Sequence, residues 1–147
     1  MKLEIETKNE QETMLIAEKF GKSLFSPCVV SLDGDLGAGK TTFVKGLAKG
    51  LGITENITSP TFTILNNYSL ENGKNLYHFD LYRLNDTEEF YAMGFEEYFD
   101  LTTLKGITVV EWASNCQNII PARHFLVSIK KGEGNNRTIS IIPKGLV

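Results

Sequence analysis

A glycine-rich segment at residues 34–42 constrains this chain more than any other feature of its sequence. It reads GDLGAGKTT and fits the pattern G-x-x-x-x-G-K-[ST]. Glycine at positions 34, 37 and 39 allows the backbone to form a concave loop whose N–H groups point at one anion. The apolar run at 28–33 predicts a buried strand before the loop, and the residues after it predict a helix. The segment therefore predicts a strand–loop–helix unit that binds a nucleoside triphosphate.

The predicted helix adds positive potential at the phosphates. Apolar residues recur at helical spacing from Phe43 to Leu51, and Gly52 is a typical residue at which a helix stops. The N-terminus of such a helix carries partial positive charge. We expect Lys40 to reach the β- and γ-phosphates and the Thr41 hydroxyl to hold Mg²⁺. The expected nucleotide-binding residues are Gly37, Ala38, Gly39, Lys40, Thr41 and Thr42.

The composition is that of an ordinary globular protein. The chain has 147 residues, of which 41% are hydrophobic and 22% are charged, so we expect one domain spanning 1–147. No apolar run approaches the roughly 20 residues of a membrane span, and the N-terminus lacks the apolar stretch of a secretory signal. Cys28 and Cys116 form neither a metal-binding spacing nor a disulfide framework. We therefore expect a cytoplasmic protein with no membrane association.

The charge balance argues against a large nucleic-acid surface. The net charge is −3, and the only three arginines, Arg83, Arg123 and Arg137, are far apart in the sequence. Nucleic-acid binding depends on clustered lysines and arginines that neutralise phosphates. If nucleic acid matters to this protein, we expect a partner to hold it.

The first 24 residues predict a strand and a helix. Leu3 and Ile5 alternate with charged residues, which is typical of a strand. Thr7 followed by Glu10 resembles a capping box that opens a helix running to about Leu24. Its expected apolar face consists of Met14, Leu15, Ala17, Phe20 and Leu24.

The remaining segments predict an α/β fold. Strands are expected at 61–70 and 75–82 as a hairpin, at 107–110, and at 124–131 and 137–142 as a second hairpin, with a helix beginning near Asp86. The simplest arrangement is a three-layer, P-loop NTPase-like fold. Its mixed sheet would have a parallel core with antiparallel hairpin additions.

The segment YHFDLYR at 77–83 predicts a strand whose side chains alternate between two faces. Tyr77, Phe79 and Leu81 would face the core, and His78, Asp80 and Tyr82 would face the other way. Asp80 is then either solvated or directed into a site, where it would orient the attacking water or hold Mg²⁺ through its hydration shell. His78 by itself is interpreted as a packed strand residue.

The segment ITVVEW at 107–112 resembles the strand that ends in a metal-binding carboxylate beside a phosphate loop. In open α/β sheets, ligands bind at that edge of the sheet. Most such strands end in Asp, but Glu111 has the same charge and the hard oxygen ligands that suit Mg²⁺. Without the phosphate loop, the same pattern would describe a strand ending at a solvated glutamate. Trp112 is interpreted as a packing residue.

Two further features concern the nucleotide. The polar segment TSPT at 58–61 is either a switch that senses the γ-phosphate or a plain turn. The Asn-Lys-x-Asp signature of guanine-specific GTPases is absent from the sequence, which favours ATP.

Five segments together resemble the bacterial TsaE (YjeE) family of ATPases in tRNA threonylcarbamoyladenosine biosynthesis. They are GDLGAGKTTF at 34–43, SPTFTIL at 59–65, HFDLYRL at 78–84, GFEEYF at 94–99 and VVEW at 109–112. They occur in the order and spacing of the family and extend over nearly the whole chain. The phosphate loop alone is shared by a vast superfamily, whereas its combination with the other segments is far more specific.

The resemblance implies a Mg²⁺-dependent ATPase that is weak alone and works with a TsaB–TsaD pair. That pair transfers a threonylcarbamoyl group to an adenosine of tRNA, so the partners would hold the tRNA and ATP hydrolysis would reset the assembly between rounds. By the family pattern, Lys40, Asp80 and Glu111 serve hydrolysis, and Thr41 and Glu111 hold the metal. The resemblance also implies that residues 7–13 and Arg137 help to frame the adenine.

Two other functions stay open. A P-loop small-molecule kinase uses the same loop but passes the γ-phosphate to a metabolite, usually under lid arginines, which three scattered arginines do not supply well. A nucleotide-gated binding module without significant hydrolysis would not need Asp80 and Glu111 at the phosphates.

Overall fold

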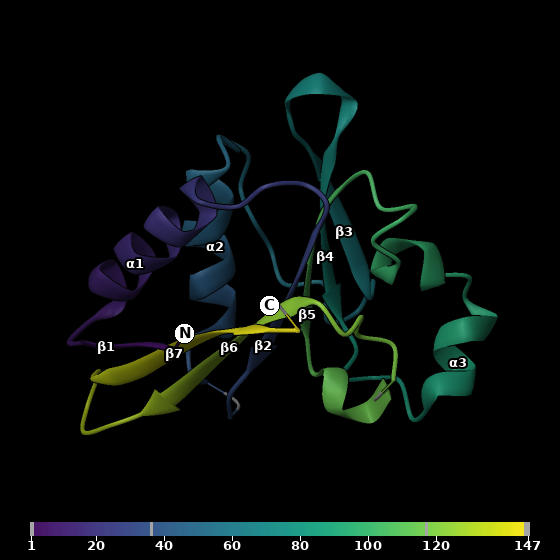
Figure 1. The fold of residues 1–147 in the computed structure, drawn as a ribbon. Helices are drawn as coiled ribbons and strands as arrows, with labels where there is room; N and C mark the ends of the chain where they lie inside the picture. Colours follow the sequence, from purple (N-terminus) through teal and green to yellow (C-terminus); the bar gives the residue numbers. More distant parts are fainter. Residues whose placement is uncertain (1, 36, 117, 146–147) are drawn as a thin grey trace.

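The structure is a computed structural model, and it describes residues 2–35, 37–116 and 118–145 (Figure 1). Leu36, which belongs to the predicted phosphate loop, lies outside the described residues. The strands are β1 (Leu3–Thr7), β2 (Cys28–Asp33), β3 (Leu65–Ser69), β4 (Asn75–Asp80), β5 (Gly106–Glu111), β6 (His124–Lys131) and β7 (Arg137–Lys144). The α-helices are α1 (Glu10–Lys22), α2 (Lys40–Gly50) and α3 (Thr87–Ala92). Short 3₁₀ helices are η1 (Glu71–Gly73), η2 (Glu96–Phe99) and η3 (Ala113–Cys116).

The strands in the described ranges form one mixed sheet in the order β1-β7-β6-β2-β5-β4-β3. The four central strands β6, β2, β5 and β4 are parallel to one another. The pairs β6–β7, β7–β1 and β3–β4 are antiparallel. This topology confirms the predicted α/β fold with a parallel core and antiparallel hairpin additions.

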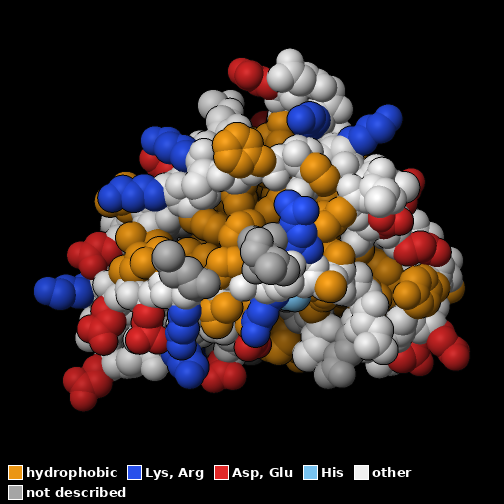
Figure 2. All heavy atoms as spheres, viewed as in Figure 1, with side chains coloured by type: hydrophobic (Ala, Val, Ile, Leu, Met, Phe, Trp, Pro, Cys, Tyr) orange, Lys and Arg blue, Asp and Glu red, His pale blue; other side chains and the backbone are white. Residues whose placement is uncertain are grey.

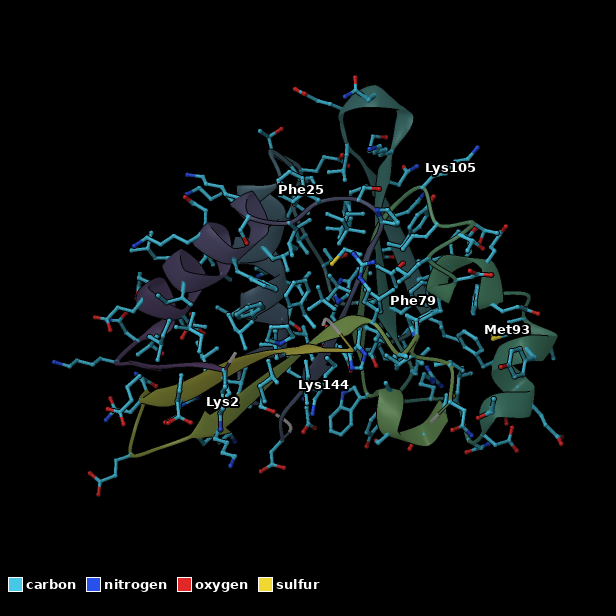
Figure 3. The ribbon with its side chains drawn as sticks, in the orientation of Figure 1. Lys2, Phe25, Phe79, Met93, Lys105 and Lys144 are labelled. Atoms are coloured by element: carbon cyan, nitrogen blue, oxygen red, sulfur yellow. The ribbon has the colours of Figure 1, made fainter. Side chains whose placement is uncertain are left out.

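Helices pack on both faces of the sheet, which gives three layers. α1 and α2 lie together on one face, where Phe43 and Leu47 contact the core beside Val30 and Val109. α3, η2 and η3 cover part of the other face, and in Figure 3 Phe79 lies in that interior. Figure 1 shows α3 at the opposite end of the sheet from the α1–α2 pair. Of the helices in the described residues, none combines the length and apolar character needed to cross a bilayer.

α1 and α2 approach each other backbone to backbone. A Cβ atom at Gly46 of α2 would overlap the carbonyl oxygen of Met14, and one at Gly21 of α1 would overlap that of Leu47. Only glycine fits such a crossing. The contact fixes α1 against the helix that follows the phosphate loop, and so places the start of α1 beside that loop.

The start of α1 differs from the predicted capping box. The N-cap residue is Asn9, whose side chain accepts a hydrogen bond from the backbone N–H of Glu12 (2.8 Å). Thr7 instead ends β1, and its hydroxyl lies 2.7 Å from that of Thr13. Leu15, predicted on the buried face, is 51% exposed. The buried face of α1 is therefore narrower than predicted and does not include Leu15.

The first hairpin is shorter than predicted. β3 begins at Leu65 rather than at 61, because 61–63 form a turn and Ile64 has a φ of +70°, which is incompatible with a strand. β4 ends at Asp80, so Tyr82 lies outside the strand and is 55% exposed. The second hairpin is longer than predicted, since β7 continues to Lys144.

Candidate nucleotide-binding site

The predicted phosphate loop joins β2 to α2, as the sequence indicates. Gly37 and Gly39 have φ values of +78° and +107°, which side chains other than glycine rarely tolerate. Gly34 is needed for a different reason, because a Cβ there would lie 2.7 Å from the carbonyl oxygen of Ile129. α2 begins at Lys40 without a side-chain cap, so its first N–H groups face the loop rather than a capping residue.

One cavity of about 290 Å³ brings together most of the predicted site residues. It is lined by Glu10, Gly37, Gly39, Lys40, Thr41, Thr42, Ser59, Thr61, Asp80, Glu111 and Trp112. The phosphate loop, the 58–61 segment and the ends of β4 and β5 therefore meet at a single site. Ala38, also predicted at the site, lines an adjoining cavity instead.

Asp80 and Glu111 lie opposite each other at the carboxyl ends of the parallel strands β4 and β5. Each is only 3% exposed, so neither is a solvated surface carboxylate. Asp80 accepts hydrogen bonds from the Thr61 hydroxyl (3.0 Å) and from the backbone N–H of Tyr82 (3.0 Å). These bonds fix the Asp80 carboxylate at the edge of the cavity.

Glu111 is held by His78, which the sequence interpretation treats only as a packed strand residue. The His78 Nε2 atom lies 2.6 Å from Oε2 of Glu111, and His78 is completely buried. The alternation of β4 does place His78 and Asp80 on one face. The contact between His78 and Glu111 depends on the register of β4 against β5, which the sequence pattern does not reveal.

Lys40 is bonded to its own loop in this structure. Its Nζ atom donates to the carbonyl oxygens of Gly34 and Asp35 (3.2 Å for the latter) and lies 4.1 Å from the ring centroid of Trp112. Burial lowers the pKa of Lys40 from its ordinary value, and nearby carboxylates, that of Glu111 first, oppose this shift. The ammonium group therefore lies inside the loop, next to the space where phosphates would be bound.

Trp112 lies at the site rather than in the core. It follows β5 directly and has a φ of +60°, which is uncommon for a residue other than glycine. Its ring packs edge-on against Tyr82, with 5.0 Å between the centroids, and covers the Lys40 ammonium. The interpretation of Trp112 as a packing residue is therefore incomplete, since it also forms a wall of the cavity.

The segment 58–61 is tied to the site by its hydroxyl groups. Thr61 donates to Asp80, and the Ser59 hydroxyl lies 2.8 Å from that of Thr61. Both residues line the cavity. The segment thus contacts a site carboxylate directly, and this contact is compatible with both a switch and a plain turn.

A second cavity of about 430 Å³ adjoins the first and shares four lining residues with it, namely Glu10, Gly37, Gly39 and Thr42. It is lined by Asn9, Glu10, Gln11, Thr13, Gly37, Ala38, Gly39, Thr42, Asn135 and Arg137. Arg137 donates from Nε to the carbonyl oxygen of Ala38 (2.9 Å). The start of α1 and Arg137, which the family resemblance assigns to the adenine, therefore lie on the same side of the loop.

The donor set of the first cavity suits Mg²⁺ that is held jointly with phosphate. The Thr41 hydroxyl and the carboxylates of Asp80 and Glu111 all line it. Magnesium typically takes one or two protein carboxylates together with waters and phosphate oxygens. Across the described ranges, no group of three or more His, Cys, Asp or Glu side chains could hold a metal ion by itself.

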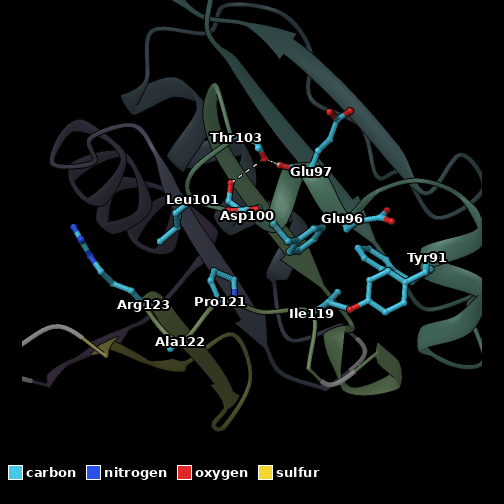
Figure 4. Close-up of a pocket in the computed structure, with 12 residues that line it drawn as sticks. Tyr91, Glu96, Glu97, Asp100, Leu101, Thr103, Ile119, Pro121, Ala122 and Arg123 are labelled. Carbon is cyan, nitrogen blue, oxygen red and sulfur yellow. Dashed lines mark hydrogen bonds between the residues drawn. The ribbon is translucent and has the colours of Figure 1, made fainter.

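A third, separate cavity of about 640 Å³ lies beside α3 and η2 (Figure 4). Tyr91, Glu96, Asp100, Pro121 and Arg123 are among the residues that line it. No predicted site residue does so. It is therefore distinct from the candidate nucleotide site.

The β2–loop–α2 unit, the parallel core and the carboxylate at the end of β5 define a P-loop NTPase-like α/β protein. A family model described as "Threonylcarbamoyl adenosine biosynthesis protein TsaE" matches residues 7–139. The chain therefore belongs to the TsaE family, which confirms the resemblance seen in the sequence. The family acts in tRNA threonylcarbamoyladenosine biosynthesis.

Individual relatives agree with this assignment. The tRNA threonylcarbamoyladenosine biosynthesis protein TsaE of Bacillus subtilis is 40% identical over 139 residues, which cover 95% of this chain and 84% of that protein. The TsaE protein of Nostoc is 39% identical over 136 residues, covering 92% and 82% of the two chains. The crystal structure of Bacillus subtilis YdiB matches with a TM-score of 0.82 at 36% identity and covers 99% of this chain and 87% of that one.

Proposed function

We propose that this protein binds ATP with Mg²⁺ at the cavity between the phosphate loop and the ends of β4 and β5, and hydrolyses it slowly. The observation that supports this most is the placement of Asp80 and Glu111. Both are buried carboxylates that line one cavity with Lys40 and Thr41. A site that only bound phosphate would gain nothing from two negative charges beside it.

Each residue has a chemical task in this proposal. The loop N–H groups and Lys40 bind the phosphates, and Lys40 exchanges its carbonyl partners for phosphate oxygens. Thr41 and Glu111 hold the metal ion, which would neutralise charge on the phosphates when bound. Asp80 orients the attacking water. Its carboxylate is suited to this because the N–H of Tyr82 and the hydroxyl of Thr61 fix its plane.

The adjoining cavity is the proposed place of the nucleoside. It shares Glu10, Gly37, Gly39 and Thr42 with the first cavity, so a nucleotide could occupy both through one phosphate chain. Its volume of about 430 Å³ suits a small molecule. The absence of the guanine-specific signature from the sequence supports adenine over guanine.

We further propose that TsaB and TsaD are the partners, in the cytoplasm, and that they hold the tRNA. Family membership supports the pathway, and the net charge of −3 supports a tRNA held elsewhere. ATP hydrolysis would then reset the assembly between rounds of modification.

The decisive test is ATP turnover measured with and without TsaB and TsaD. Turnover should be slow for the protein alone and should rise when both partners are added. Equal turnover in the two conditions would contradict the partner-dependent function.

The alternatives have less support. A small-molecule kinase usually places arginines over the phosphates, but no arginine lines the first cavity among the described residues. Arg83 lies over the Phe62 ring, and Arg137 is bonded to loop carbonyls. ATP consumption that depended on an added metabolite would favour the kinase. A binding module without hydrolysis leaves the buried pair of carboxylates unexplained.

A further inference from the structure

His78 has no task in the proposed reaction, yet it is one of the most completely buried polar side chains in the described structure. We propose that His78 is a positioning residue that holds the Glu111 carboxylate in the orientation needed to bind the metal. The proposal rests on the proposed function, because it assumes that Glu111 is a metal ligand. It concerns how Glu111 is aimed rather than what Glu111 binds.

The strand register explains how His78 reaches Glu111. His78 pairs with Val109 across the parallel β4–β5 ladder, and Asp80 pairs with Glu111. Leu76 and Val109, which lie on the same face as His78 and Glu111, belong to the core beneath α1 and α2. His78 therefore lies between that core and the site, and it bonds to Glu111 of the next residue pair along the strands.

The hydrogen bond occupies one oxygen of Glu111 and leaves the other for a ligand. An ionised carboxylate only accepts hydrogen bonds, so His78 Nε2 is the donor to Oε2. The hydrogen-bond partner of Glu111 lies at Oε2, so we infer that Oε1 is the oxygen turned to the cavity that Glu111 lines. A single bond thus fixes both the rotamer and the exposed oxygen of the carboxylate.

The other ring nitrogen shows that packing alone does not account for this histidine. His78 Nδ1 is the only buried side-chain nitrogen or oxygen without a hydrogen-bond partner in the part of the chain that the structure describes. A buried polar atom without a partner is unfavourable, and buried polar groups are nearly always bonded. An apolar residue would fill the same space without this cost. The bond to Glu111 is the feature that an apolar residue could not supply.

Glu111 has a longer side chain than aspartate, so its carboxylate depends more on a hydrogen bond that fixes its orientation. Glu111 has one more methylene group than the aspartate that most such strands carry, so its carboxylate has more rotamers to lose on binding a metal. Side chains that bond to a metal-binding carboxylate from behind reduce this loss by fixing its orientation. His78 and the longer acid are therefore expected to function as a unit.

The test compares replacements of His78 that differ in reach. His78→Gln places an amide N–H donor near the position of Nε2, whereas His78→Asn has the same amide on a shorter side chain. His78→Leu fills the space without a donor. For each variant, the affinity for ADP is measured by titration without metal and with Mg²⁺, and the ratio of the two affinities gives the gain from the metal.

We expect His78→Leu and His78→Asn to keep the metal-free ADP affinity and to lose about 10- to 100-fold of the gain from Mg²⁺. His78→Gln should keep most of that gain. In a Glu111→Gln background, adding His78→Leu should cause no further loss. Thermal unfolding of every variant identifies any variant that does not fold. If His78→Leu does not fold, the comparison of His78→Gln with His78→Asn tests the proposal by itself.

Equal gains from Mg²⁺ in His78→Gln and His78→Asn would overturn the proposal, as would a full gain in a folded His78→Leu protein. A further loss when His78→Leu is added to Glu111→Gln would also overturn it, because His78 would then act independently of Glu111. If the unmodified protein binds ADP with no help from Mg²⁺, the proposed function itself fails, and this failure is recognised before any variant is compared.

Discussion

Lys40 lies at the centre of the candidate site. Its ammonium group is bonded to two loop carbonyls and covered by the Trp112 ring. The ring face attracts the cation, and the carbonyls satisfy its donors. A phosphate would offer stronger, charged acceptors at nearly the same place. The side chain therefore needs only a short movement to bind a nucleotide.

Replacing Lys40 with alanine should weaken nucleotide binding. A hydrogen bond to a charged group contributes about 1.5–3 kcal/mol, which corresponds to roughly a 10- to 100-fold loss of affinity. Titration with a fluorescent ATP analogue measures this loss. Lys45→Ala is the matched control, because Lys45 lies on the exposed side of the same helix and should bind nucleotide normally. Unchanged affinity in Lys40→Ala would contradict the placement of the phosphates.

Asp80→Asn should separate binding from hydrolysis. The amide keeps the shape of the side chain and an acceptor for the N–H of Tyr82, but it cannot act as a base toward water. We expect ATP affinity within about two-fold of the unmodified protein and a fall in turnover of at least about 100-fold. Normal turnover in this variant would show that Asp80 does not act in hydrolysis.

Both cysteines should be unreactive in the folded protein. Burial raises the pKa of the Cys28 thiol to about 11, against a smaller opposing effect of Arg123, and burial also raises the pKa of Cys116. Only the thiolate reacts, and at pH 8 a pKa near 11 leaves roughly one Cys28 thiol in a thousand ionised. Reaction with a thiol reagent at pH 8 should therefore be slow until denaturant is added. Rapid labelling of the native protein would contradict this.

Some residues of the site could be predicted from the sequence and others could not, and the difference has a physical reason. Lys40 and Thr41 follow from a local motif, and Glu111 follows from an apolar strand ending in an acid. His78 and Trp112 were underestimated because their importance depends on partners that are remote in sequence. His78 meets Glu111 only through the β4–β5 register, and Trp112 meets Lys40 only through the loop conformation.

The crossing of α1 and α2 requires glycine at three positions. Gly21, Gly46 and Gly50 each lie so close to a backbone carbonyl of the other helix that a Cβ atom would overlap it. Glycine in the middle of a helix ordinarily destabilises it. Glycine is nevertheless required here by the close approach of the backbones, which brings α1 and its N-terminal residues to the wall of the second cavity.

Gly46→Ala should therefore destabilise the protein, although alanine favours helices. A Cβ at this position would overlap the carbonyl oxygen of Met14 and lie 2.7 Å from the Cβ atom of Ala17. Such overpacking costs about 1–3 kcal/mol of unfolding free energy, which outweighs the helix preference of about 1 kcal/mol. Denaturant unfolding measures the difference. A variant as stable as the unmodified protein would show that the helices can separate without cost.

Element boundaries were harder to predict than the elements themselves. All seven strands of the described sheet have a counterpart in the sequence prediction. The errors lie at the ends of the elements, where a single side-chain hydrogen bond or backbone angle sets the boundary. Asn9 caps α1 in place of Thr7 because its side chain reaches the N–H of Glu12. β3 starts late because Ile64 has a positive φ, which no propensity for β structure would indicate.

At the scale of the whole molecule, positive and negative side chains are mixed on the face shown in Figure 2 rather than gathered in separate patches. Figure 2 shows lysine and arginine side chains interspersed with acidic ones on the face it presents. The net charge is −3, and of the three arginines Arg137 begins β7, whereas Arg83 and Arg123 lie in separate connecting segments. Interspersed charges of both signs do not form the continuous positive surface that binds a phosphate backbone.

The isolated protein should therefore not retain tRNA at about 0.15 M salt, where exposed charges are largely screened beyond roughly 8 Å. A gel-shift experiment with labelled tRNA tests this, with the TsaB–TsaD pair as the positive control. Retention of tRNA by this protein alone would contradict the proposal that partners hold the nucleic acid.

The strand order of the sheet has a consequence for how the protein folds during synthesis. β2, which leads into the phosphate loop, pairs with β5 on one side and β6 on the other. Both neighbours are made long after it, and β6 is complete only at Lys131. Pairing between segments this far apart is slow, because the entropy of closing the intervening chain must first be overcome. We therefore expect the proposed nucleotide to stabilise the finished protein rather than a chain still emerging from the ribosome, in which β5 and β6 are not yet available to pair with β2.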